Sequence, residues 1–192
     1  MGFRHLKLKR SVLLISLISL LPPAAFAQAQ WPQIELTDLP GTNGEWQEGA
    51  AVIPAPREKV LEWLTDYPAW PERFPDIEWA QVLPDDAEGR HVIKFRSRIA
   101  EATLTVHEAV SPALLVFEGS ATFAYTQGRI HLIDLGNGTT RVLMQSTAQA
   151  RGIAKLFATK ALKRRRAHQV STSHLLALWH LAQAFRKWST GT

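Results

Sequence analysis

The chain has 192 residues, with 22 Lys or Arg, 17 Asp or Glu and no Cys. This length suits one domain with a sizeable core, and the absence of cysteine excludes disulfides, thiolate metal sites and a thiol nucleophile. The formal charge of +5 does not indicate nucleic-acid binding, because the amino-terminal segment accounts for most of it.

Residues 1–27 have the features of a secretory signal peptide. Four cations precede an almost wholly apolar run from Ser11 to Leu21. This run is shorter than the ~20 residues that a membrane span requires, and two prolines follow it, which argues against an uncleaved anchor. We expect cleavage after Ala27 and a mature protein in the periplasm or outside the cell. There is no cysteine at the cleavage site, so the sequence does not indicate a lipid anchor.

The remaining basic residues are concentrated near the carboxyl terminus. Without the four cations of the signal, the chain keeps 18 Lys and Arg against 17 Asp and Glu, and nine of these cations lie between Arg151 and Lys187, where there is no acid. One explanation is attraction between this segment and the acidic remainder of the chain. The alternative is contact with an anionic lipid headgroup or an acidic protein partner through Lys160, Lys163, Arg164, Arg165 and Arg166.

Residues 28–44 mix Pro, Gly, Asn and other polar residues without periodicity, which predicts an extended arm with little structure of its own. A domain is expected over residues 45–187. Its first strand, residues 45–53, ends at two prolines, and Pro56 then starts a short amphipathic helix. From Asp66 to Asp76, three prolines and three aromatic residues predict a stiff corner, giving two short helices between the first and second strands.

Six more strands are expected from alternating apolar and polar residues. The last two are joined by a hairpin at Gly136-Asn137-Gly138. Short connections imply antiparallel neighbours. The expected strands span residues 77–83, 93–99, 103–110, 114–119, 123–135 and 140–149.

A long closing helix is predicted from Gly152 to Lys187, where apolar residues recur with helical spacing. The hydroxyls of Ser171, Thr172 and Ser173 can compete for backbone hydrogen bonds, so we expect a bend there. The apolar stripe of this helix is the one long element available to cover a face of the sheet. The pattern predicts an α+β fold, with a seven-stranded antiparallel sheet curved around the C-terminal helix.

The corner and two later strands resemble a known superfamily. The sequence IPAPREKVLEWLTDYPAWPERFPDI at residues 53–77, PALLVFE at 112–118 and GTTRV at 138–142 are similar to START-like proteins, which include polyketide cyclases/dehydrases and lipid-transport proteins, and especially to the coenzyme Q-binding members. The resemblance covers about residues 46–185. It implies a helix-grip fold with a hydrophobic cavity between the sheet and the C-terminal helix. It also implies binding of lipids, quinones or polyketides, with catalysis in a minority of members.

The sequence offers little support for metal or nucleophilic chemistry. His168, His174 and His180 are spaced six residues apart, which rotates each by roughly 240° on a helix, so they cannot share a face. There is no Gly-x-Ser-x-Gly elbow and no glycine-rich phosphate loop. We expect no metal site and no cofactor.

Apolar residues are the main candidates for a ligand site. Core packing by itself also explains most of them. The candidates for lining a cavity are Trp70, Phe74, Trp79, Phe95, Phe117, Phe123, Tyr125, Met144, Leu175, Leu178 and Trp179. The candidates for orienting a ligand are the polar residues Arg96, His107, Glu108 and Glu118.

Three hypotheses follow from these residues. The first is an exported carrier or sensor, without enzymatic activity, for a lipid or another hydrophobic small molecule. The second is a cyclase or dehydratase that uses an inward-facing carboxylate, Glu108 or Glu118, or a histidine. The third is a partner-binding module acting through residues 160–166. The sequence does not define the ligand or the oligomeric state.

Overall fold

The structure is a computed structural model. It describes residues 32–42, 45–98, 100–108, 113–122, 124–156 and 159–190. The chain divides into two units, Met1–Trp31 and Pro32–Thr192. The first unit contains the expected signal peptide and lies outside the described residues.

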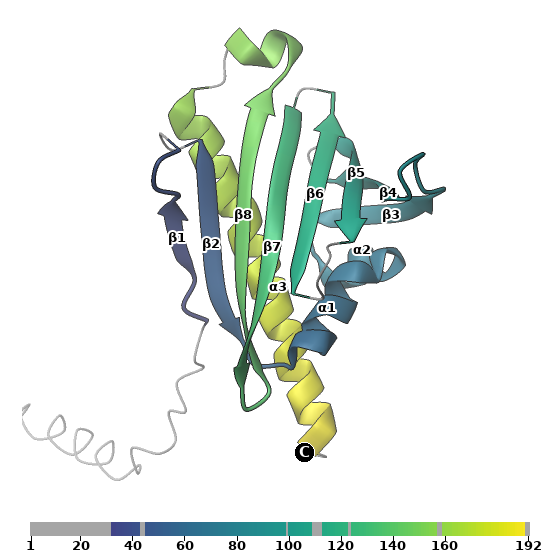
Figure 1. Ribbon diagram of the computed structural model, residues 1–192, viewed down its shortest axis with the longest axis vertical. Coiled ribbons are helices and arrows are strands. Elements are labelled where there is room, and N and C mark those ends of the chain that lie inside the picture. Colours follow the sequence, from purple (N-terminus) through teal and green to yellow (C-terminus); the bar gives the residue numbers. More distant parts are fainter. Residues whose placement is uncertain are drawn as a thin grey trace, which may run out of the picture. The chain divides into compact units, whose positions relative to one another are not determined.

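The second unit contains one antiparallel sheet with strand order β1-β2-β8-β7-β6-β5-β4-β3 (Figure 1). All seven expected strands are present, and there is one more, so the expectation of seven strands was wrong by one. The strands are β1 (Glu35–Asp38), β2 (Trp46–Ile53), β3 (Ile77–Leu83), β4 (His91–Ser97), β5 (Glu101–Glu108), β6 (Leu114–Ala121), β7 (Ala124–Gly136) and β8 (Thr139–Ala150).

The additional strand β1 lies in the segment expected to be an extended arm with little structure of its own. Its four residues pair with β2 from Glu35↔Ala50 to Asp38↔Gln47. The neighbouring Ile34 packs against the core. Pairing satisfies backbone groups that β2 would otherwise expose at a sheet edge. A strand this short has too few residues to show an alternation in the sequence.

The expected corner is built from α1 (Arg57–Thr65), η3 (Tyr67–Ala69) and α2 (Trp70–Arg73). Pro56 precedes α1, and its carbonyl accepts from the Val60 amide at 3.1 Å. An ion pair joins the two ends of this corner: the guanidinium of Arg73, at the end of α2, lies 2.6 Å from the carboxylate of Asp66, which follows α1. The corner therefore has a defined shape and can position the aromatic residues that it carries.

The closing helix differs from the expectation at its start and in its middle. The segment after β8 forms a separate short helix, η4 (Gly152–Leu156), beginning at a glycine with φ of +55°, and α3 then runs without a break from Lys160 to Thr190. The expected bend at residues 171–173 is therefore wrong. The hydroxyl of Ser173 donates to the Asp76 carboxylate instead of competing for the backbone of its own helix.

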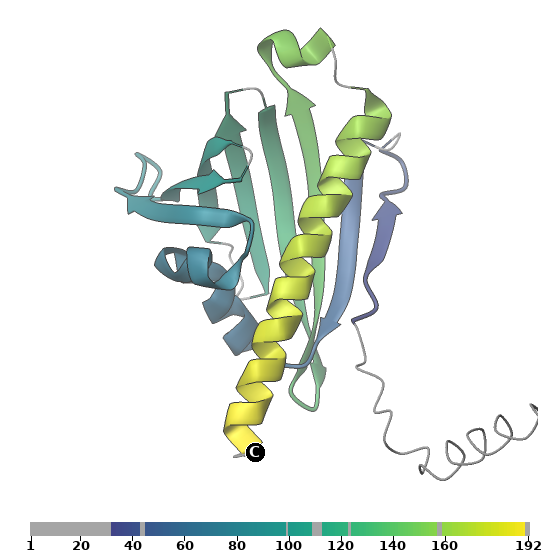
Figure 2. The ribbon, with the colours of Figure 1, turned by 180° about the vertical axis from the view of Figure 1, so that it is seen from behind.

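The helix α3 crosses one side of the sheet diagonally and lies over β2 and β8 (Figure 2). Its buried stripe includes Ala167, Ser171, Leu175, Leu178 and Ala182. The spacing of three or four residues is that of a single helical face. The side of the sheet beneath α3 is therefore where the core lies and where a ligand would have to bind.

Candidate functional site

The strand register shows which residues face α3. A Cβ atom added to Gly49 would lie 2.6 Å from Cβ of Ser171 and 3.3 Å from Cδ1 of Leu175, so Gly49 points at the helix. Residues paired directly across strands share a face, and Gly49 pairs with Met144, which pairs with Ile130. Rows across the sheet thus assign each residue to the helix-facing side or to the outer side.

Near α1, the helix-facing rows carry large apolar side chains. Leu115 and its row partners Ile130 and Met144 are all buried, and Leu132 pairs with Val142 in the adjacent row. All five belong to one packed cluster that includes two leucines of α3 with no exposed surface, Leu175 and Leu178. This half of the helix-facing side is a closed core.

The opposite end of the sheet is built from much smaller residues. A row of four alanines crosses β5, β6, β7 and β8, and the next row combines one leucine with Gly, Thr and Ala. We call these two rows the alanine-rich surface. Its members are Ala102, Ala121, Ala124 and Ala150 in the outermost row, and Leu104, Gly119, Thr126 and Ala148 in the next.

The alanine-rich surface is partly uncovered. All of its residues except Gly119 are half-buried, although they lie on the same side of the sheet as the closed core. Two features explain this exposure: the side chains are short, and α3 lies over only β8 of the four strands that carry them. The one side-chain hydroxyl on the surface, that of Thr126, donates to the Thr147 carbonyl at 2.8 Å. The surface is therefore suited to apolar contact.

Phe117 separates the alanine-rich surface from the closed core. It lies one row further in, paired with Gly128. A Cβ atom on Gly128 would lie 2.2 Å from Cζ of Phe117 and 2.7 Å from the Gln145 carbonyl oxygen, so the ring of Phe117 covers this glycine. Only a residue without a side chain can sit beneath the ring.

Aromatic rings from the corner border the same surface. Trp70 makes edge-to-face contacts with Tyr67, Phe74 and Phe95 at centroid distances of 5.2, 6.0 and 6.1 Å. Its indole N–H donates to the Leu64 carbonyl at 3.1 Å, so its polar atom is satisfied within the protein. Phe95 pairs with Ala102 of the alanine-rich surface. The aromatic cluster and the alanine row are therefore continuous.

His174 of α3 also faces this interior. Its ring lies 5.0 Å from that of Phe74, and Nδ1 lies 2.9 Å from the Val170 carbonyl oxygen. Burial lowers the pKa of His174 from 6.5, although the Val170 carbonyl and the Asp76 carboxylate oppose the shift. The neutral imidazole therefore donates from Nδ1 to Val170.

This lowered pKa predicts a loss of stability in mild acid. The folded state binds the proton of His174 less readily than the unfolded state, so the stabilisation is fully present above pH ~6.5 and is lost as the pH falls through the folded-state pKa. The expected slope is at most about 1.4 kcal/mol per pH unit. Urea unfolding of the wild type and of His174→Gln from pH 8 to pH 5 measures it. If the free energies of unfolding of the wild type and of His174→Gln change in parallel over this pH range, the assignment to His174 is wrong.

Eight of the expected cavity residues lie in the main core cluster: Trp70, Phe74, Phe95, Phe117, Met144, Leu175, Leu178 and Trp179. The structure thus brings them together on the helix-facing side. Phe123 lies outside the described residues. Ligand contact by any of these residues stays a prediction.

Trp79 and Tyr125 lie on the outer side and do not line the interior. A β-bulge between Ile77 and Trp79 interrupts the alternation, and Trp79 then pairs with Arg96 on the outer side. Tyr125 is adjacent to the helix-facing Thr126 and so points the other way. Its hydroxyl donates to the Glu118 carboxylate at 2.9 Å, which raises the pKa of Tyr125.

The polar candidates are not gathered at the interior. Glu118 lies between the helix-facing Phe117 and Gly119, so its expected inward orientation is wrong. Arg96 is exposed on the outer side and lines a polar surface depression together with Glu78. The side chains of His107 and Glu108 lie outside the described parts of the chain.

The basic residues at the start of α3 are mostly exposed. Arg164 contacts the Asp38 carboxylate of β1 at 3.0 Å, which accords with attraction between the helix and the acidic remainder. Lys160, Arg165 and Arg166 are exposed, and Lys163 is half-buried. Attraction within the chain thus accounts for one member of the group.

Sequence reasoning missed the alanine-rich surface and the packing of Tyr67, whereas it placed His174 in the apolar stripe of the closing helix. The signal for the first was available, because small residues occupy alternate positions in three strands: Gly119 and Ala121, Ala124 and Thr126, and Ala148 and Ala150. A search for large apolar residues passes over such positions. No pattern in the sequence places Tyr67 beneath β4 and β5, where it packs with Ile93 and Val106.

Within the described residues, no three His, Asp or Glu side chains gather closely enough to hold a metal ion. None of the described helices is long and apolar enough to cross a bilayer.

Comparison with known proteins shows similarity to solved structures. No family model and no curated protein matches the chain. A START superfamily protein from Mycobacterium smegmatis aligns with a TM-score of 0.64 at 13% identity, covering 73% of this chain and 98% of that one. The chain has a START-like helix-grip fold. Its sheet carries one strand more than the seven expected from the resemblance.

Two further START-like structures show what this fold supports in other proteins. The Zhui aromatase/cyclase from Streptomyces sp. R1128 has a TM-score of 0.58 at 17% identity, with coverage of 79% of this chain and 94% of that one. A STAR-related lipid transfer protein from Xanthomonas axonopodis has a TM-score of 0.56 at 14% identity, with coverage of 81% and 95%. Identities this low establish the fold and leave the function open.

Proposed function

We propose that this protein binds a lipid or another hydrophobic small molecule between the sheet and α3, and acts as a carrier or sensor. The observation that carries the proposal is the alanine-rich surface, which is apolar and half-buried and lies beside a cluster of four aromatic rings. Covering such a surface with an apolar molecule lowers the free energy, because apolar area is removed from water. The lipid transfer protein from Xanthomonas axonopodis, which has the same fold, supports this choice.

Apolar contact would supply most of the affinity. Burial of roughly 300 Å² of apolar ligand and protein surface at about 25 cal/mol per Å² contributes on the order of 7 kcal/mol, from which the entropic cost of association is subtracted. The polar groups described at the site are already engaged, as the bonds from Trp70 to Leu64 and from Thr126 to Thr147 show. This favours a ligand with a long apolar part over a polar metabolite.

The proposal includes export. The basic and apolar segment followed by Ala25-Phe26-Ala27 supports cleavage and a periplasmic or secreted mature protein. A hydrophobic ligand in such a compartment would need a protein to hold it in water, which accords with a carrier.

Native mass spectrometry of the protein purified from its own host, followed by organic extraction, tests this function. We expect a mature chain beginning at Gln28 with one stoichiometric lipid, quinone or polyketide. A protein that is purified empty, and whose melting temperature does not respond to a panel of such compounds, would contradict the binding proposal.

A cyclase or dehydratase is the second candidate, because the Zhui aromatase/cyclase has the same fold. It requires an ionisable side chain at the bound molecule. Glu118 cannot serve, since it lies on the outer side, whereas His174 faces the interior. Conversion of an extracted compound by the purified wild type, but not by His174→Gln, would favour the enzyme.

A further inference from the structure

The segment between β8 and the first turns of α3 exposes an unusual amount of apolar surface. Ile153, Leu156 and Leu162 are 69%, 80% and 56% exposed, which makes them the three most exposed large apolar side chains among the described residues. Single exposed apolar residues are common on protein surfaces, but neighbouring ones mark sites of interaction.

The local geometry places two of them together. Residues three apart in a 3₁₀ helix project from the same side, so Ile153 and Leu156 of η4 form one apolar edge. Leu162 lies in the first turn of α3, shortly after η4 in the chain. None of the three belongs to the core clusters identified in the described part of the protein.

The same segment is strongly basic. Residues 151–166 include seven Lys or Arg and no acid. Two of the seven are engaged within the protein: the Arg151 guanidinium lies 4.8 Å from the ring centroid of Tyr125, and Arg164 contacts Asp38. For the other five, the described residues provide no carboxylate within ion-pair distance. These five are Lys155, Lys160, Lys163, Arg165 and Arg166.

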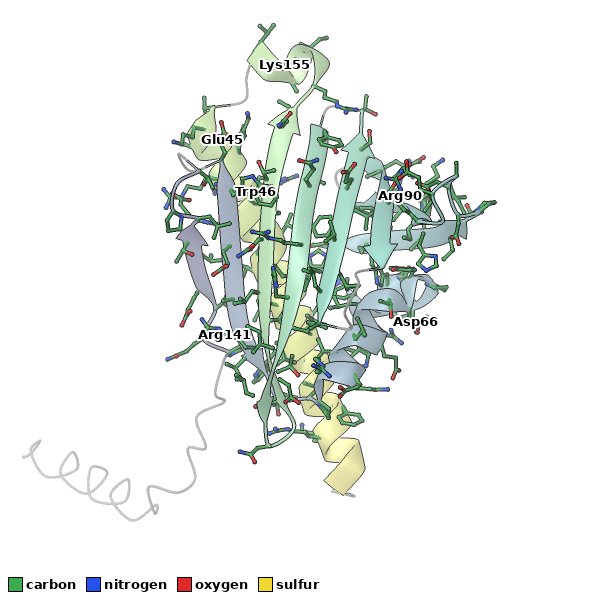
Figure 3. The ribbon with its side chains drawn as sticks, viewed as in Figure 1. Glu45, Trp46, Asp66, Arg90, Arg141 and Lys155 are labelled. Carbon is green, nitrogen blue, oxygen red and sulfur yellow. The ribbon has the colours of Figure 1, made fainter. Side chains whose placement is uncertain are left out.

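The position of this segment leaves it accessible. Beyond the ends of the strands, η4 projects from the sheet (Figures 1 and 2), and Lys155 lies at its extremity (Figure 3). The alanine row ends at Ala150, directly before this segment. The exposed apolar edge and the partly uncovered interior thus lie at the same end of the sheet.

We propose that η4 and the first turns of α3 form a docking surface for an anionic lipid bilayer. Ile153, Leu156 and Leu162 would enter the boundary between headgroups and acyl chains, while the five unengaged cations contact lipid phosphates. A bilayer fits this surface better than an acidic protein, because projecting apolar side chains without a complementary pocket can insert into lipid. The five cations match the charge of an anionic headgroup layer.

This surface is separate from the alanine-rich surface, so the two proposals can fail independently. A membrane-docking protein without a ligand would still bind vesicles, and a ligand carrier without a docking surface would still purify with its ligand.

Vesicle co-sedimentation of the mature protein tests the docking. The vesicles contain phosphatidylcholine either alone or mixed with phosphatidylglycerol. Binding is expected to the mixed vesicles and to weaken strongly in high salt, because the Debye length falls to about 3 Å at 1 M. Lys155→Gln/Lys160→Gln/Lys163→Gln should reduce the partition coefficient on the order of a hundredfold, at about fivefold per cation. Ile153→Ser/Leu156→Ser should reduce it at least tenfold, since about 0.8 kcal/mol is lost per CH₂ withdrawn from the lipid.

Matched controls come from exposed residues near the β7–β8 hairpin. Val52 and Leu135 are 49% and 48% exposed, so Val52→Ser/Leu135→Ser should leave vesicle binding within about twofold of wild type. The proposal is overturned if the protein binds neither kind of vesicle, or if the Ile153→Ser/Leu156→Ser variant binds vesicles as well as wild type does. It is also overturned if soluble polyglutamate competes as well as anionic vesicles, which would indicate an acidic protein partner.

Discussion

Replacing Phe74 by alanine is expected to lower the free energy of unfolding by about 3–5 kcal/mol, the usual cost of removing a buried aromatic ring. Phe74 is 2% exposed and touches both Trp70 of the corner and His174 of α3. Its backbone N–H also donates to the Trp70 carbonyl at 2.8 Å. The ring therefore joins the corner to the closing helix, and its loss leaves a cavity between the two.

Urea unfolding at pH 7.5 measures this effect, with Leu162→Ala as the control. Leu162 is 56% exposed, so its truncation should change the free energy of unfolding by no more than about 0.5 kcal/mol. Because small domains are stable by only about 5–15 kcal/mol, the loss expected for Phe74→Ala is a large fraction of the total free energy of unfolding. A loss below about 1 kcal/mol would show that the ring is not part of the core.

Replacing Ala148 by tryptophan is expected to abolish ligand retention while the protein remains folded. Ala148 is half-buried in the second row of the alanine-rich surface, where an indole would occupy the position proposed for the ligand. Loss of roughly 120 Å² of apolar contact corresponds to about 3 kcal/mol, on the order of a hundredfold in affinity. The amount of compound extracted per mole of purified protein measures the change.

Gln149→Trp is the matched control, because Gln149 is the next residue of β8 and is exposed on the outer side. It adds the same ring without blocking the interior, so it should retain ligand like wild type. Ala124→Trp offers a second test if Ala148→Trp fails to fold. Full retention in a folded Ala148 or Ala124 variant would place the ligand elsewhere.

Local patterns in the sequence predicted most of the secondary structure. Alternation in Ile93, Lys94 and Phe95 predicted β4, and the three residues of the β7–β8 turn adopt the positive φ angles of 75°, 53° and 66° that the glycine-asparagine pattern indicated. These signals depend on neighbours in the chain and on a fixed side-chain period. They can therefore be recognised in the sequence without knowledge of the tertiary structure.

The candidate site was predicted less well than the fold. The large apolar residues expected to line a cavity are mostly in the core, as shown by Leu175 and Leu178, which have no exposed surface. The partly uncovered surface beside them consists mainly of alanines. Their short side chains matter because they leave this part of the sheet incompletely covered. The members of the row lie far apart in the chain, from Ala102 at one end to Ala150 at the other, so no local window contains the row.

The sequence by itself determined the order of β2 to β8, α1 and α3, the pairing of the last hairpin and the amphipathic stripe of α3, because backbone propensity and side-chain periodicity are local properties. Only the tertiary structure decided that β1 pairs with β2, that the bulge after Ile77 turns Trp79 outward, and that residues 171–173 stay helical. Each of these outcomes depends on a partner distant in the chain: the free edge of β2, the register of β4, and Asp76, which accepts the hydroxyl of Ser173.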